Sequence, residues 1–150
     1  MEQWIRKSIF VSLFTALLIL LVATACGGSD SNPNEQDIER PAPPAEYAGK
    51  TNPLVNDGAA VEAGKQLYSS NCVSCHGAKA MGDGPAANSL NPKPKPLAAE
   101  MKSLHDDYLF WRVSEGGAFR PFTSAMPAWK SILSEEEIWQ VIAFLRTPEK

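Results

Sequence analysis

Two cysteines and a histidine stand within five consecutive residues, Cys72-Val73-Ser74-Cys75-His76. In a turn of helix, cysteines three positions apart place their sulfur atoms on one side, at a spacing that suits two covalent bonds to a single flat partner. The histidine that follows is held at the edge of that partner and can turn a ring nitrogen toward its centre. The pentapeptide therefore predicts two covalent attachment points and one metal ligand, around which the rest of the chain must fold.

The C-x-x-C-H order is the motif that attaches a c-type haem, with thioether bonds at Cys72 and Cys75 and with His76 as the proximal iron ligand. A zinc half-site, a thioredoxin-like dithiol and a disulfide are alternatives that use the same residue types. A zinc site needs two further ligands, for which only His105 and the distant Cys26 remain. A thioredoxin-like dithiol should follow a strand in a βαβ pattern, which the sequence lacks. We therefore predict one covalently bound haem c.

The length and charge of the chain restrict its class. Its 150 residues are enough for one domain with a leader and a linker, and the formal net charge is -3 at pH 7. This balance lacks the basic surplus that nucleic-acid-binding domains carry. We therefore expect no nucleic-acid partner.

Residues 1–25 have the features of an export signal. Arg6 and Lys7 give a positive start, an almost unbroken apolar run follows over residues 9–22, and small residues precede Cys26. The end of this leader resembles a bacterial lipobox, which implies that Cys26 is lipid-modified and becomes the N-terminus. The alternatives are an uncleaved signal anchor and cleavage that leaves a free thiol at Cys26. The apolar run of about 14 to 17 residues is short for a membrane-spanning helix of about 20, which argues against the uncleaved anchor. We expect an exported protein, anchored to the lipid bilayer and facing the periplasm or the cell exterior.

Residues 26–56 contain the lipid-attachment site and a proline-rich segment with almost no apolar periodicity. We expect this segment to be a flexible linker, or alternatively a segment that becomes ordered by docking on a partner. The compact domain is expected to span residues 57–150.

Helix signals divide the domain into three helices and long loops. They predict helices over residues 58–70, over residues 106–114 and from Ser134 to a stop at Pro148, with Asp57 as the first cap and Ser134-Glu135-Glu136-Glu137 as a capping box. Gly64 is costly within a helix unless another helix approaches it closely, so we expect the first and last helices to cross there. Residues 77–101 show no helical pattern, and a loop this long suits a compact domain only if it wraps a cofactor. No strand pattern appears, so the expected fold class is all-α.

The distal side of the iron needs a second protein ligand if the haem is to be a closed electron carrier. Met126 lies in a proline-containing loop between two predicted helices, where it has no helical core face to fill. Met81, Met101 and His105 are the other candidates. From its position in that loop we expect Met126 to bind the iron. Its soft thioether sulfur would favour Fe(II) and raise the reduction potential relative to two histidine ligands.

Together these features resemble the class I cytochromes c. The matching segments are residues 72–77, Gly64 with Tyr68, Met126-Pro127-Ala128-Trp129, and residues 134–146. The resemblance implies three to five helices around one haem, crossing N- and C-terminal helices, and His76 and Met126 as iron ligands. It also implies that the carbonyl of Pro85 accepts a hydrogen bond from Nδ1 of His76. A weaker likeness, in loop composition and anchoring, is to the monohaem lipoprotein subunit of bacterial alternative complex III.

A cytochrome of this kind implies one-electron transfer rather than catalysis, so no catalytic residue is predicted. We expect a quinol-oxidising complex as donor and a terminal oxidase or photosynthetic reaction centre as acceptor, with the protein either a free carrier or a fixed subunit of such a complex. A haem enzyme or gas sensor is the alternative, and it requires an open distal iron position. Two further sets of residues are candidates for roles. Tyr108, Trp111 and Trp129 are candidates to line the haem or bond a propionate, with packing in the core as the alternative. Arg112 could offset propionate charge or lie on a solvated helix face. An acidic partner could dock on lysines around one edge, namely Lys65, Lys79, Lys93, Lys95, Lys102 and Lys130, although the net charge of the chain is negative.

Overall fold

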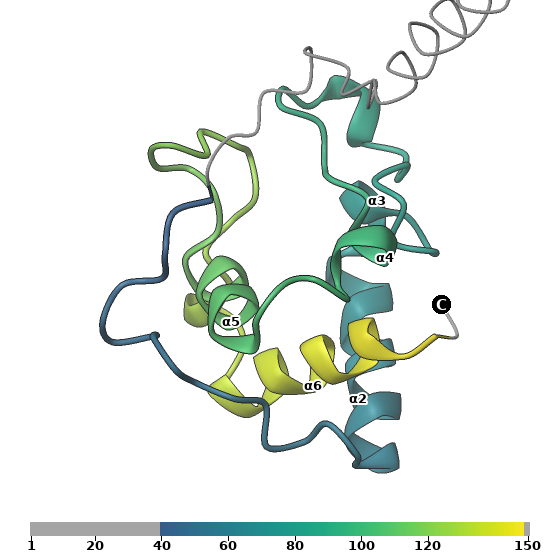
Figure 1. The fold of residues 1–150 in the computed structure, drawn as a ribbon. Coiled ribbons are helices and arrows are strands. Elements are labelled where there is room, and N and C mark those ends of the chain that lie inside the picture. The colour runs from purple at the N-terminus through teal and green to yellow at the C-terminus, as the bar shows by residue number, and fades with distance from the viewer. Residues whose placement is uncertain (1–39, 149–150) are drawn as a thin grey trace, which may run out of the picture. The chain divides into compact units, whose positions relative to one another are not determined.

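A computed structural model describes residues 40–148. The predicted leader, Cys26 and the first part of the predicted linker lie outside the described residues. No strand occurs among residues 40–148, so the all-α prediction is confirmed for them. The helices (Figure 1) are α2 Gly58–Asn71, α3 Val73–His76, α4 Leu97–Glu100, α5 Asp106–Glu115 and α6 Glu135–Arg146, with the short 3-10 helices η1 Ala87–Ser89 and η2 Trp129–Ser131.

The start of α2 is capped as the sequence predicts. Asp57 Oδ1 accepts hydrogen bonds from the backbone N–H groups of Ala59 at 2.9 Å and Ala60 at 3.1 Å, which satisfies two donors at the start of the helix. Tyr68 lies on the buried face of α2, and its hydroxyl donates to the carbonyl of Gly77 at 2.8 Å. The buried face of α2 therefore also holds the segment that follows the cysteine motif.

The capping box predicted at the start of α6 is present. Ser134 Oγ accepts a hydrogen bond from the Glu137 N–H at 3.2 Å, and Glu137 Oε2 accepts one from the Ser134 N–H at 2.7 Å. Trp139 stacks on Phe110 of α5 with 4.2 Å between the ring centroids, which joins the two helices. The apolar residues of α6 are buried: Ile138, Trp139, Val141, Ile142, Phe144 and Leu145.

The helices α2 and α6 cross at Gly64, as predicted. A Cβ atom at this position would lie 1.9 Å from the carbonyl oxygen of Gln140 and 2.4 Å from its carbonyl carbon. Two helix backbones approach this closely only where one of them has no side chain. Figure 1 shows the crossing, with α3 continuing from the end of α2. The contact therefore fixes the start of the cysteine motif relative to α6.

Residues 40–56, which we call the strap, lie along α5 and α6 (Figure 1). The ring of Tyr47 packs on that of Phe110, with 6.1 Å between centroids. Asn52 is 7% exposed; its side-chain amide donates to the carbonyl of Trp139 at 3.0 Å, and its backbone N–H donates to Asp106 Oδ2 at 2.9 Å. The structure therefore differs from the flexible linker predicted here. These hydrogen bonds reach residues 54 and 87 positions away and follow no period, so a reading of local patterns does not find them.

Residues 77–101 fold back on the cysteine motif. The backbone N–H of Gly84 donates to the carbonyl of Cys75 at 3.2 Å, and that of Ala98 donates to the carbonyl of Ala80 at 3.0 Å. The sequence predicts no helix in this segment, whereas the structure contains η1 and α4. These elements have 3 and 4 residues, which is too short for a periodic pattern to appear.

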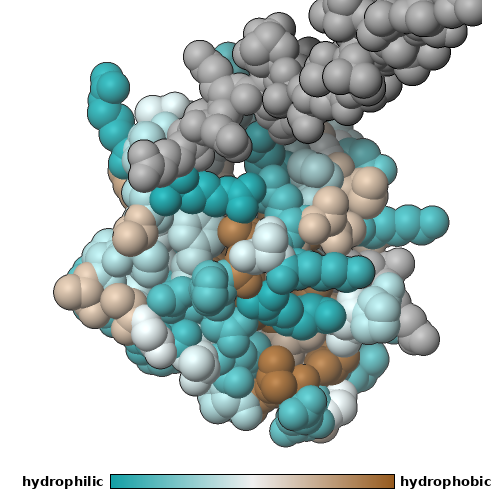
Figure 2. Space-filling view, viewed as in Figure 1, coloured by the Kyte–Doolittle hydropathy of each residue, from teal (hydrophilic) through white to brown (hydrophobic). Residues whose placement is uncertain are grey.

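Hydrophilic residues cover most of the face seen in Figure 2, and hydrophobic residues form small patches between them. Val55, Met81 and Ile132 are the exposed large hydrophobic residues within the described part of the chain. None of the helices in residues 40–148 has the length and apolar character needed to cross a bilayer. All six lysines expected to form a docking surface are exposed.

Candidate haem-binding site

The two cysteines and the histidine are brought onto one short turn. The carbonyl of Cys72 accepts hydrogen bonds from the N–H groups of Cys75 at 3.2 Å and His76 at 2.9 Å, which closes the turn of α3. Both thiols are half-buried and neither forms a disulfide. Burial, with a smaller effect of the neighbouring Cys75, raises the pKa of Cys72 to about 11, so this thiol stays protonated at neutral pH. The arrangement can present both sulfurs and the imidazole to one flat group.

His76 is half-buried at the end of α3. Burial lowers the pKa of its imidazole, which favours the neutral ring that binds metal ions. Its Nδ1 is buried and has no hydrogen-bond partner among the described residues. Nδ1 is the ring nitrogen that the resemblance pairs with a carbonyl, which leaves Nε2 as the atom available to a metal ion. The histidine therefore fits the role of an iron ligand beside two attachment cysteines.

The hydrogen bond predicted from Nδ1 of His76 to the carbonyl of Pro85 is not formed. Pro85 is exposed, and the backbone N–H groups of its neighbours Gly84 and Ala86 donate to carbonyls of the cysteine motif. These two bonds hold the turn against the backbone of α3 rather than against the imidazole. The sequence gives the position of this proline but not the direction of its carbonyl.

The predicted distal ligand, Met126, lies half-buried in the loop between α5 and η2. Its carbonyl accepts a hydrogen bond from the N–H of Gly117 at 2.9 Å, and the carbonyl of Gly117 accepts one from Ser124 at 2.7 Å. At Gly116, where φ is +68°, a Cβ atom would lie 2.5 Å from the Met126 carbonyl and 2.4 Å from that of Pro127. The end of α5 therefore holds the methionine segment tightly. Figure 1 shows this loop and α3 on different sides of the unit, with α5 and α6 below them.

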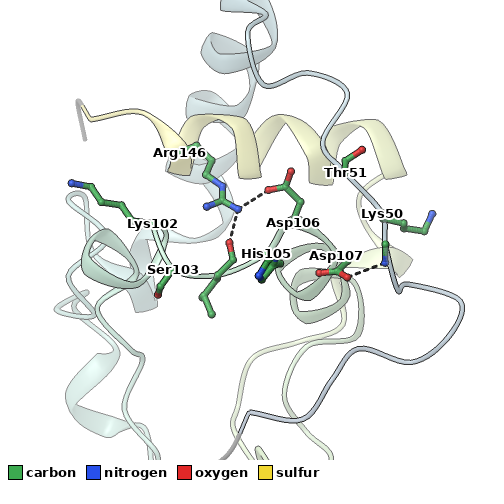
Figure 3. Close-up of a pocket in the computed structure, with 10 residues that line it drawn as sticks. Lys50, Thr51, Lys102, Ser103, His105, Asp106, Asp107 and Arg146 are labelled. Carbon is green, nitrogen blue, oxygen red and sulfur yellow. Dashed lines mark hydrogen bonds and ion pairs between the residues drawn. The ribbon is translucent and has the colours of Figure 1, made fainter.

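The other candidates for the distal position lie in different environments. Met101 is 4% exposed and packs in the hydrophobic core, whereas Met81 is 51% exposed. His105 is exposed at the start of α5, in the surface pocket of Figure 3. In that pocket Arg146 donates to Asp106 Oδ1 at 2.6 Å, so the polar groups there join α6 to α5. The surroundings of Met126 are those expected for a ligand that is held in place and partly shielded from water.

A cation lies beside the methionine loop. The guanidinium of Arg112 is 3.4 Å from the ring centroid of Phe122, and 5.6 and 5.7 Å from those of Phe119 and Trp111. It donates to the carbonyl of Gly116 at 2.6 Å. Burial lowers the pKa of Arg112, but a guanidinium keeps its charge at physiological pH. No carboxylate of residues 40–148 forms an ion pair with it. A half-buried cation in these surroundings is suited to an anionic group of a bound molecule.

Trp111 and Arg112 are candidates from the sequence, whereas their neighbours Phe119 and Phe122 are not. Trp111 is 5% exposed and contacts both phenylalanine rings, with centroid separations of 5.8 and 5.6 Å. Tyr108 meets Trp111 edge to face at 5.8 Å. The two phenylalanines lie in a loop without periodicity, so only the rise in aromatic content after α5 could have indicated them.

Within residues 40–148 no group of three or more His, Cys, Asp or Glu side chains is arranged to hold a metal ion, which is the arrangement that the zinc alternative requires. Residues 59–145 match the family described as cytochrome c oxidase, cbb3-type, subunit III. The chain belongs to this cytochrome c family. The family implies a covalently bound haem c and a function in electron transfer, and the two thiols and the imidazole on α3 fit that group. The predicted resemblance to cytochromes c and the predicted helical fold are thereby confirmed.

The cytochrome also has relatives among characterised proteins. It is 36% identical over 105 residues to the cytochrome c subunit of alcohol dehydrogenase (quinone) from Gluconobacter oxydans. That match covers 65% of this chain and 20% of the relative, so the chain spans one fifth of the relative's length.

Two solved structures are similar. Cytochrome CL from the marine methylotrophic bacterium Methylophaga aminisulfidivorans is 26% identical with a TM-score of 0.49, over 64% of this chain and 59% of that one. A chain of the Kuenenia stuttgartiensis reducing HAO-like protein complex is 23% identical with a TM-score of 0.49, over 59% of this chain and 43% of that one.

Proposed function

We propose that this cytochrome c carries single electrons in a respiratory or photosynthetic chain, with one haem c whose iron is bound by His76 and Met126. The proposal is carried by one observation: the single turn of residues 72–76 holds two free, half-buried thiols and a half-buried imidazole that burial keeps neutral. The bound haem supplies one-electron Fe(III)/Fe(II) chemistry. The chain binds that group, keeps water from it and sets its potential.

Cys72 and Cys75 would hold the haem through thioether bonds. His76, neutral because of its burial, would offer a ring nitrogen to the iron. The thioether of Met126 would be the second protein ligand. With both ligands retained in the two oxidation states, the site would need little reorganisation when an electron enters or leaves.

Arg112 is proposed to lie near the haem propionates. Its charge is half-buried, is held over Phe122 and has no carboxylate partner among the described residues. Oxidised haem carries one more positive charge than reduced haem. In surroundings of low dielectric constant, a nearby cation would therefore disfavour the oxidised state relative to the reduced one and raise the potential. Tyr108, Trp111 and Trp129 are proposed to enclose the ring.

The location and partners of the protein form the second part of the proposal. The leader and Cys26 support export and a lipid anchor, with the domain facing the periplasm or the cell exterior. A quinol-oxidising complex would be the donor and an oxidase or reaction centre the acceptor. The relative that is a subunit of a quinone-linked alcohol dehydrogenase supports a quinone-linked redox partner. The exposed lysines offer contacts to an acidic partner surface.

The ligand assignment is tested with spectra of the ferric protein. Met126→Ala should abolish the far-red charge-transfer band that methionine–iron ligation produces, and should lower the reduction potential. Met81→Ala is the matched control and should retain both. A band that persists in Met126→Ala would show that another residue is the ligand. Carbon monoxide binding by the reduced wild-type protein at neutral pH would favour the gas sensor or haem enzyme instead.

The anchor and the partners need separate measurements. Cys26→Ser should move the protein from the membrane fraction to the soluble fraction. Extraction in mild detergent followed by native electrophoresis should show whether the haem migrates alone or with a larger complex. Migration with a large complex would mean a fixed subunit rather than a free carrier.

A further inference from the structure

The side chain of Glu115, at the end of α5, joins two distant parts of the chain. Its Oε1 accepts a hydrogen bond from the hydroxyl of Tyr47 in the strap and another from Nζ of Lys130 in η2, the latter at 2.7 Å. The carboxylate is 26% exposed, whereas the lysine side chain is 55% exposed. Both hydrogen bonds involve an ionised group, and such bonds are about twice as strong as neutral ones. We call these three side chains the carboxylate bridge.

The carboxylate bridge reaches η2, which begins three positions after Met126. This 3-10 turn is held internally, because the N–H groups of Ile132 and Leu133 both donate to the carbonyl of Trp129 at 2.8 Å. The side chain of Trp129 also packs against the hydrophobic core. A displacement of Lys130 would therefore move the whole turn and the segment before it.

The other side of the methionine segment is held by the two residues that follow Glu115. Gly117 donates its N–H to the carbonyl of Met126, and Gly116 leaves room for that carbonyl and for the carbonyl of Pro127. Glu115, Gly116 and Gly117 thus contact both the methionine segment and the η2 turn that follows it. Gly116 and Gly117 act through the backbone, whereas Glu115 acts through its carboxylate.

The strap supplies the other hydrogen bond to the carboxylate, from the hydroxyl of Tyr47. Tyr47 is fixed by its own turn, in which its N–H donates to the carbonyl of Pro44 at 2.9 Å, and its ring packs on Phe110. Removal of the hydroxyl alone would leave this packing in place. The strap therefore contributes one hydrogen bond, from the hydroxyl of Tyr47 to the carboxylate of Glu115.

We propose that the carboxylate bridge positions Met126 at the iron, so that the strap is a part of the redox site rather than only a connection to the leader. This inference rests on the proposed ligation of the iron by Met126. Tyr47, Glu115 and Lys130 act through the η2 turn and do not themselves touch the haem. Their loss should make dissociation of the methionine from ferric iron easier while the fold stays intact.

Imidazole added to the full-length ferric protein measures this dissociation, because it binds iron only where the methionine has left. Tyr47→Phe should bind imidazole about tenfold more tightly than wild type, which corresponds to about 1.4 kcal/mol. Lys130→Met should act in the same direction, and the double variant should show less than the product of the two single effects. The control is Lys50→Gln, which breaks the 3.1 Å ion pair of the same strap with Glu135 in α6 but touches neither η2 nor Glu115.

Each outcome of this experiment decides something. Tighter imidazole binding in Tyr47→Phe, with Lys50→Gln close to wild type, supports the proposal. Equal changes in both variants, or no change in either, would overturn it and leave the strap with a structural role only. If wild-type protein lacks the methionine–iron band, the ligation itself fails and the positioning inference falls with it. If that band is present and is lost in Met126→Ala, a negative result in Tyr47→Phe counts against the positioning inference alone.

Discussion

Replacement of Gly64 by alanine introduces a methyl group where α2 and α6 cross. The new Cβ would lie 1.9 Å from the carbonyl oxygen of Gln140, and the helices would have to separate by about 1.5 Å to reach an ordinary van der Waals contact of 3.4 Å. The atoms in the way belong to the backbone of α6, so no change of side-chain rotamer relieves the contact. Overpacking of this kind costs about 1–3 kcal/mol or more. A gain of about 1 kcal/mol in helix propensity offsets part of it.

The free energy of unfolding of Gly64→Ala should therefore fall by about 2 kcal/mol. Urea unfolding of the ferric protein, followed by far-UV circular dichroism, measures this change. Gly58→Ala is the matched control on the same helix, because a Cβ there meets no atom within 4 Å. It should be neutral or stabilising by up to about 1 kcal/mol. Equal stability of the two variants would refute the close crossing of α2 and α6.

Three other changes test the site and the strap. Arg112→Gln should lower the reduction potential by an amount on the order of 50 mV, while the exposed Arg120→Gln should change it much less; equal shifts in a potentiometric titration would rule out a special role for Arg112. Asn52→Ala should destabilise the protein by about 1–3 kcal/mol, because it removes a buried hydrogen bond to the backbone of α6, and an unchanged urea midpoint would contradict that cost. Hydrogen bonds, chiefly from Lys130, hold the pKa of Glu115 below its usual value. Its contribution to stability is therefore complete above about pH 4.3 and is lost as the pH falls through the lower pKa of the folded state. The difference in urea midpoint between wild type and Glu115→Gln should accordingly shrink in acid, and a constant difference down to pH 3 would argue against the carboxylate bridge.

Local signals predicted most of the helical framework. Asp57 and the Ser134 capping box are contacts between residues two or three positions apart, so their partners can be read directly from the chain. The crossing at Gly64 was predictable for a different reason. A glycine in the middle of an otherwise apolar helix face is costly unless a second backbone needs the space.

The redox site could be predicted only in part. The spacing of the cysteine motif predicts the attachment residues and the proximal histidine, because the residues for that chemistry lie within one turn of helix. The surroundings of the methionine side chains can be described only from the structure. It places Met101 in the core and shows that the loop of Met126 is held by the end of α5. The predicted contact of Pro85 failed because the direction of a carbonyl in a loop depends on backbone bonds made elsewhere.

The sequence by itself determined that this chain is helical and where its first and last helices meet, and it predicts that Cys72 and Cys75 attach the haem. Those properties depend on residues close together in the chain, or on a position where only glycine leaves room for a second backbone. Only the tertiary structure decided that the strap belongs to the domain and that Tyr47 shares a carboxylate with Lys130. Such contacts join residues 68 and 15 positions apart, and each depends on single side chains that no periodic pattern marks.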